Sequence, residues 1–273
     1  MAFQSMSNSF SADSRATGDE FPFVTLSTFE TLAEPARRQS GVEVFTFSPI
    51  VTQELKPVWQ EYSLAEQSWL QDSREVAVLN PNGVFNASDY LPGSITPFIY
   101  DLVGTAPVPS VGHGPFLPAW QTSPPPFSPG FVNFNTLDAT FLPRVFQSML
   151  AVREAVLSGV ENFAGLSSTA FKPEDHEEYH KQVVDYDKNE TSTTYDHPHS
   201  LLMQPIFKTL HDHTSDVVGV LSGVVAWDRY LDDLLPEGIN GLTCVLKNTC
   251  GQAYTYQLDG NRVSHRRTDR VIL

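Results

Sequence analysis

The stretch from residue 201 to residue 259 constrains the fold most, because it reads as two strands, a short helix and a hairpin. Residues 201–207 and 217–227 are short, mostly apolar runs. Both are too short and too rich in β-branched residues for buried helices, so we expect two adjacent strands joined by an exposed loop. Gly219 and Gly223 leave one face of the second strand nearly bare, which weakens a strand unless another backbone or a ligand approaches closely.

A short helix and a second pair of strands complete this unit. Leucines at helical spacing between residues 230 and 235 predict the helix, and Pro236 in the following Pro-Glu-Gly ends it. Residues 242–247 and 252–258 are predicted as the last two strands. They flank a turn at residues 248–251, where Asn and Gly adopt positive φ at low cost.

The two cysteines of the chain, Cys244 and Cys250, lie six positions apart across this turn. We expect a disulfide between them, which would close a small loop. Two cysteines supply too few soft ligands for a metal, and they lack the Cys-x-x-Cys spacing of redox sites. The alternative is two reduced, buried cysteines.

Three blocks of this unit, QPIF, VVGVLSGVVAWDRYLDDLLPEGINGLTCVL and NTCGQAYTY, resemble the extracellular region of receptor-type nucleotide cyclases of diatoms and related algae. That region is similar to the CHASE class of sensors, in which a PAS-related α/β domain lies between membrane helices. Residues 23–40, FVTLSTFETLAEPARRQS, resemble the stalk helix of the family. Residues 42–62, VEVFTFSPIVTQELKPVWQEY, resemble the strand, Pro turn and helix that follow the stalk.

The resemblance covers about residues 21–260 and implies an α+β sensor domain. Its stalk helices and first strand would occupy residues 21–75, and a Pro-rich cover residues 80–130. A helix and a PAS-like antiparallel sheet would follow over residues 137–260. Residues 1–20 are Ser-rich and polar, so we expect them to be disordered. The tail after residue 260 departs from the family and is expected to be truncated.

The PAS-like sheet itself is expected at about residues 160–260, with a small-molecule ligand bound between the sheet and the Pro-rich cover. Gln204, Trp227 and Tyr254 are the candidates for lining that pocket. The ligand would shift a homodimer between two packings of its stalk, by as much as its affinities for the two states differ.

One motif indicates a different chemistry. His176-Glu177-Glu178-Tyr179-His180 matches H-E-x-x-H, which on a helix places two imidazoles on one face and offers Glu177 as a base, as in zinc peptidases. Glu178 and the charged residues around the motif predict a solvated face rather than the apolar setting of such a helix. We therefore expect no metal at His176 and His180, and a zinc metallohydrolase is kept as the alternative.

Four other histidines form two alternating pairs, His197 with His199 and His211 with His213. In a strand, each pair could point to one face and bind a metal. Titrating surface histidines are the interpretation that we favour.

The sequence shows no catalytic centre and no cofactor site. It contains neither a Gly-rich phosphate loop nor a G-x-S-x-G motif. Asp232 and Asp233 are adjacent on the predicted helix and do not share a face, so they do not make the metal-binding pair of a cyclase. The chain is therefore expected to be a signal-input module, with the cyclase activity belonging to a catalytic domain of the full-length family protein.

Charge and hydropathy restrict the partners and the location that are possible for this chain. A net charge of −15, with only 17 Lys and Arg, argues against binding nucleic acid or anionic membranes. No stretch approaches the ~20 apolar residues that span a bilayer, and the N-terminus lacks the pattern of a signal peptide. We interpret the chain, soluble as given, as a fragment of a receptor at the extracellular face of the plasma membrane. A stand-alone ligand-binding or structural domain is the alternative.

Overall fold

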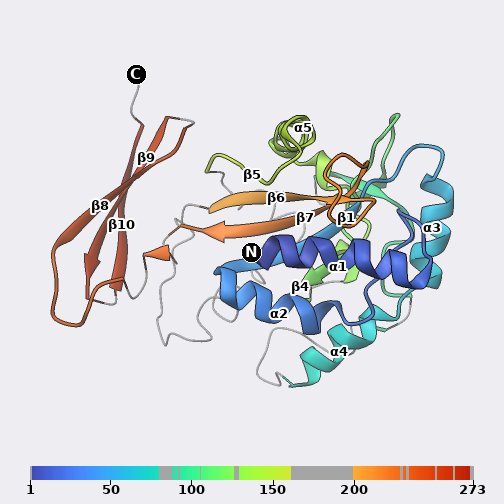
Figure 1. Ribbon diagram of the computed structural model, residues 1–273, viewed down its shortest axis with the longest axis horizontal. Helices are drawn as coiled ribbons and strands as arrows, with labels where there is room; N and C mark the ends of the chain where they lie inside the picture. The colour runs from blue at the N-terminus through green and yellow to red at the C-terminus, as the bar shows by residue number, and fades with distance from the viewer. Residues whose placement is uncertain are drawn as a thin grey trace.

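The computed structural model of the protein describes residues 2–79, 88, 90–91, 93–104, 106–125, 129–160, 199–227, 230–231, 234–249, 251–260 and 262–270, with backbone only at 76–79, 262 and 265–270. These parts form a mixed α+β fold with a five-stranded antiparallel sheet, a three-stranded sheet and a two-stranded hairpin (Figure 1). None of the helices in these parts is long and apolar enough to cross a membrane.

The five-stranded sheet is assembled from both halves of the chain. Its strands, in spatial order, are β4 (Gln121–Ser123), β1 (Val42–Pro49), β7 (Val217–Ala226), β6 (His199–Phe207) and β5 (Val156–Leu157). All neighbouring strands are antiparallel. When the five strands are numbered by their order along the chain, their spatial order is 2-1-5-4-3. The predicted pairing of β6 with β7 is confirmed. The expected position of the sheet at about residues 160–260 is wrong, because β1 and β4 come from the N-terminal half.

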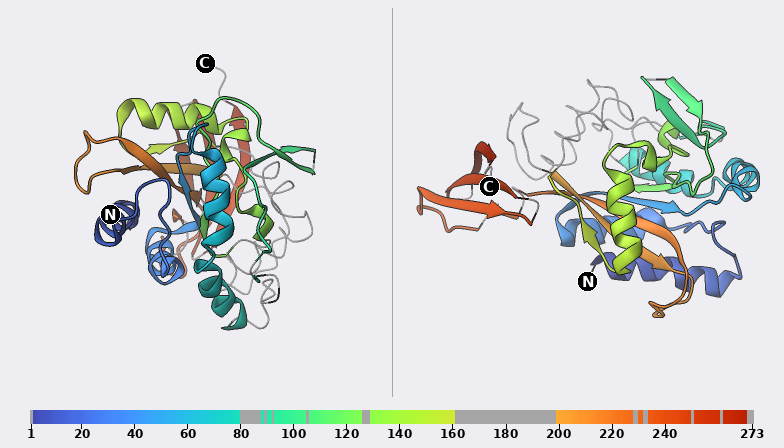
Figure 2. Two further views of the ribbon diagram at one scale, coloured as in Figure 1. Left: turned by 90° about the vertical axis from the view of Figure 1, so that its right-hand side faces the viewer. Right: turned by 90° about the horizontal axis from the view of Figure 1, so that it is seen from above.

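One face of this sheet is covered by α1 (Ala2–Thr17) and α2 (Phe29–Ser40), as Figures 1 and 2 show. The ring centroids of Phe10 and Phe47 lie 3.8 Å apart. Those of Phe3 and Phe45 meet edge to face at 4.7 Å. Met6 is buried in the same cluster.

The expected disorder of residues 1–20 is therefore wrong for α1. Phe3, Met6 and Phe10 recur at spacings of three and four and form one apolar stripe on an otherwise polar helix. Two serines beside this stripe donate hydrogen bonds to backbone carbonyls of β6. Ser7 Oγ donates to the carbonyl of Pro205 at 3.0 Å, and Ser11 Oγ donates to that of Phe207 at 2.6 Å.

The aromatic rings of Phe3 and Phe47 pack against the bare face of β7. A Cβ atom at Gly223 would lie 2.2 Å from Cζ of Phe3, and one at Gly219 would lie 3.0 Å from Cε2 of Phe47. The glycines thus make room for the close approach of the protein's own aromatic side chains.

The stalk predicted at residues 23–40 does not project from the domain. Its helix, α2, buries Phe29, Glu30 and Ala33 against α1 and the sheet. Pro35 lies inside this one continuous helix, which ends at Gly41 in the left-handed region. α2 is therefore one layer of the fold.

The opposite face of the sheet is covered by α5 (Leu142–Val152) (Figure 2). The helix expected near the start of residues 137–260 is thus present, and Pro143 lies in its first turn. Phe146 and Met149 are buried in a cluster with Met203 and Val220 of the sheet.

The Pro-rich segment forms part of the core where the structure describes it. It contributes β4 and the hairpin of β2 (Tyr100–Val103) with β3 (Ala106–Pro109). Trp120, fully buried beside β4, lies 5.2 Å from Trp59 of α3 (Lys56–Ala65) and 5.6 Å from Trp69 of α4 (Trp69–Leu79), between ring centroids. Two short 3-10 helices, η2 (Pro129–Phe131) and η3 (Thr136–Asp138), lead to α5.

A separate three-stranded sheet stands at one end of the molecule (Figure 1). Its order is β10 (Arg262–Arg270), β9 (Gln252–Asp259) and β8 (Leu242–Lys247). The predicted hairpin of β8 and β9 is confirmed, but it does not join the larger sheet. Tyr254, Tyr256 and Leu258 form its small core with Leu231.

Candidate functional site

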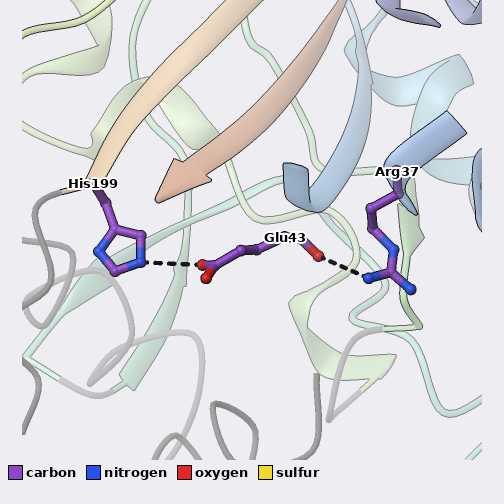
Figure 3. A network of polar contacts seen from close by, with 3 residues as sticks. All are labelled: Arg37, Glu43 and His199. Atoms are coloured by element: carbon purple, nitrogen blue, oxygen red, sulfur yellow. Dashed lines mark hydrogen bonds and ion pairs between the residues drawn. The ribbon is translucent and has the colours of Figure 1, made fainter. Parts of the chain in front are cut away.

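Buried polar side chains from separate elements meet near one end of the five-stranded sheet (Figure 3). Glu43 lies at the start of β1 and His199 at the start of β6, while β7 runs between these strands. His199 Nε2 and Glu43 Oε2 are 3.1 Å apart, and the two side chains are only 10% and 4% exposed. The expectation of a surface histidine is thus wrong for His199.

This pair can bind and hold a proton. A hydrogen bond from Nε2–H to the carboxylate fixes the orientation of a neutral imidazole, and protonation of the ring turns the contact into a buried ion pair. Removing one partner of such a pair leaves the other charge buried without compensation, which costs several kcal/mol.

Arg37 connects this pair to the helical layer. It lies in the last turn of α2, and its Nη1 donates to the carbonyl oxygen of Glu43 at 3.4 Å. Its buried Nε has no hydrogen-bond partner among the residues that the structure describes. The guanidinium therefore supplies positive charge between α2 and the first strand.

Glu30 is the second titratable centre of α2, two turns before Arg37. Burial raises the pKa of its carboxyl from 4.5 to about 7. The Ser123 hydroxyl and the charge of Arg37 oppose this rise, and the carboxylates of Glu34 and Asp72 add to it. Within the described parts, neither Glu30 Oε2 nor Ser123 Oγ has a hydrogen-bond partner, so Ser123 lies near the carboxyl without bonding to it.

Asp72 of α4 faces the N-terminus of α2. Burial raises the pKa of its carboxyl, while the backbone N–H groups of Glu30 and Thr31 act to lower it. The first turn of a helix offers such unpaired N–H groups and a partial positive charge. Two acidic side chains from different helices therefore share the region around the N-terminus of α2.

The structure separates the three predicted pocket residues. Gln204 faces α1, where its Nε2 donates to Gln4 Oε1 at 3.1 Å. Trp227 donates from Nε1 to Ser200 Oγ at 2.9 Å and belongs, with Tyr254, to the small cluster of the three-stranded sheet. Gln204 is four residues beyond Ser200 on β6, or about 13 Å at the usual strand rise, so the three residues do not surround one site.

Other candidates fall on residues that the structure does not describe. Cys244 lies half-buried in β8, opposite Tyr256, but Cys250 lies outside the described residues, so their disulfide stays a prediction. His176, Glu177 and His180 also lie outside them. Among the residues that can be placed, no group of three or more His, Cys, Asp and Glu side chains could hold a metal ion.

The sequence contains a signal for Glu43, which was not among the predicted site residues. In the run V-E-V-F-T-F of residues 42–47, Glu43 is the only charged residue, and the register of β1 shifts at this point, between Val42 and Val44. A carboxylate buried in such a strand requires a partner. The partner, His199, lies 156 positions away and could not be found from local spacing.

Comparisons with known proteins add no family. The chain matches no model of a protein family, no curated protein and no solved structure at a significant level.

Proposed function

We propose that the chain is a signal-input module, a PAS-like sensor domain that binds a small-molecule ligand and transmits a change of packing to a signalling partner. The observation that carries this proposal is the antiparallel strand order 2-1-5-4-3. It is similar to the order in PAS domains, where a helix of the connection between the second and third strands likewise lies over the sheet. Here α5 has that position between β4 and β5.

The sequence resemblance supports the same function. The block QPIF is the end of β6, and VVGVLSGVVAW contains β7; both are inner strands of the sheet. The resemblance adds the finer proposals, that the module is CHASE-like, lies at the extracellular face of a membrane and controls a nucleotide cyclase elsewhere in a longer protein.

The buried polar side chains offer a physical route for the signal. Glu30 and Arg37 belong to α2, whereas Glu43 and His199 belong to the sheet. A ligand or proton that changes one of these charges alters the cost of keeping the others buried. The packing of α2 on the sheet would then respond, by as much as the ligand distinguishes the two packings.

The test is ligand-dependent stability. Thermal unfolding would be measured against amino acids, amines, organic acids, nucleosides and divalent metals, and calorimetry would verify each compound that stabilises the chain. A ligand at about 100 times its Kd adds about 2.7 kcal/mol to the free energy of unfolding. We expect at least one class to stabilise the chain and to change hydrogen exchange in α2.

Variants make this test specific. Glu30→Gln should alter the response, whereas Glu61→Gln, an exposed substitution on α3, should not. If no compound class stabilises the chain, the sensor proposal fails and a structural domain is favoured. Stoichiometric zinc that is lost in His176→Ala would favour the metallohydrolase instead.

A further inference from the structure

The two edges of the three-stranded sheet differ in their protection. Edge strands expose unpaired N–H and C=O groups, which proteins protect with charges and bulges. β10 has four arginines and a register shift between Arg266 and Thr268. β8 has six residues in regular register with β9, without proline or a carboxylate, and Lys247 is its sole charged residue.

β8 is also the accessible edge. In the part of the chain that the structure describes, the backbone of β8 bonds only to β9. Val245, in the middle of the strand, is 50% exposed and lies on the opposite face from Cys244 and Leu246, which pack on the small core. The edges of the five-stranded sheet, β4 and β5, are only three and two residues long.

We propose that β8 pairs antiparallel with β8 of a second copy of the chain, so that two three-stranded sheets join into one of six strands. A two-fold axis perpendicular to the sheet keeps the packed faces of both copies on one side. That symmetry permits a register centred on Val245, with Lys247 opposite Thr243 of the second copy. The Val245 side chains of the two copies then lie opposite each other at the axis, and such cross-strand contacts between β-branched residues stabilise pairing.

Charge favours β8 as the contact. Each chain carries a net charge of −15, so two copies repel unless they meet where carboxylates are few. At the beginning of β8, Asp259 Oδ1 accepts the N–H of Gly241 at 2.6 Å. Antiparallel pairing brings Lys247 of one copy toward that end of the other. Pairing of β10 with itself would instead place arginines together.

The proposal goes beyond the sensor function and does not depend on it, because it rests on the strand edge alone. Sedimentation equilibrium of the full chain should show a monomer–dimer equilibrium. Val245→Lys should weaken the dimer about tenfold or more, since like charges directly opposite each other destabilise pairing. Val111→Lys, at an 88% exposed position outside the three-stranded sheet, should leave the dimer unchanged.

A cross-link tests the register. Val245→Cys, in a chain with Cys244→Ser and Cys250→Ser, should give a covalent dimer on mild oxidation, because residues opposite each other across an antiparallel pair approach to disulfide distance. Thr255→Cys, opposite Val245 on β9 and so one strand further from the axis, should not. A monomer at every concentration, or a dimer that Val245→Lys leaves intact, would overturn the proposal.

Discussion

The two sheets of this protein differ in how their faces and edges are covered. The five-stranded sheet has helices on both faces and short edge strands, and its largest buried cluster contains Phe3, Phe10, Phe45, Phe47 and Trp120. The three-stranded sheet packs one face on a small cluster and leaves a regular edge strand uncovered. The larger sheet therefore carries the main core, and the smaller one has the open edge at which we propose that a second copy pairs.

The largest effect should come from the aromatic contact between α1 and the sheet. Phe10→Ala should lower the free energy of unfolding by about 3–5 kcal/mol, because the ring is fully buried against Phe47. Denaturant unfolding measures this change, and Ser5→Ala on the exposed side of α1 is the control. An effect below about 1 kcal/mol would mean that α1 does not belong to the fold.

The buried carboxyl of Glu30 should make the larger sheet sensitive to pH. Because its folded-state pKa is raised to about 7, the folded protein binds more protons than the unfolded chain, and stability falls as pH rises from about 4.5 through 7. Glu30→Gln should remove this loss, worth at most about 3 kcal/mol above pH 7. Unfolding of wild type and variant across this range measures it, with Glu61→Gln at an exposed position of α3 as control. Equal pH slopes would contradict the account.

Close packing at Gly223 should show as coupling with Phe3. Gly223→Ala should cost about 1–3 kcal/mol in the wild type, because the new methyl group meets the ring. In a Phe3→Ala background the same substitution should cost much less, because only Cγ1 of Val42 then lies close to the new methyl group, at 3.1 Å. A double-mutant cycle gives the coupling energy, and additive effects would show that the ring does not occupy this space.

The smallest effect on the whole molecule should come from the three-stranded sheet. Leu258→Ala removes a buried side chain from its core, so amide exchange in β8, β9 and β10 should accelerate. Global stability of the five-stranded sheet should change by less than about 0.5 kcal/mol. A loss of several kcal/mol would show that the two sheets unfold as one unit.

Local patterns predicted the elements better than their assembly. The apolar runs of β6 and β7 and the hairpin of β8 with β9 follow from spacing and turn residues alone. The sheet order does not, because β1 pairs with β7 across about 170 positions or more, and β4 pairs with β1 across more than 70. Tertiary contacts likewise stabilise α1, whose polar composition hides three apolar positions.

The candidate site was less predictable for the same reason. The pair of Glu43 and His199 exists only because β7 brings the starts of β1 and β6 near each other. The raised pKa of Glu30 depends on α4 and β4 covering one turn of α2. Gln204 shares the face of β6 and β7 that carries the two glycines, and α1 covers this face, which local spacing could not predict.

Native-state hydrogen exchange of the full chain tests the contrast between the two sheets most directly. The amides of β1, β6 and β7 should exchange only through global unfolding, and those of α1 beside Phe10 should be protected with them. The amides of β8, β9 and β10 should open at a lower free energy, with β8 gaining protection as the protein concentration rises. Equal opening free energies in both sheets, or an unprotected α1, would contradict this account.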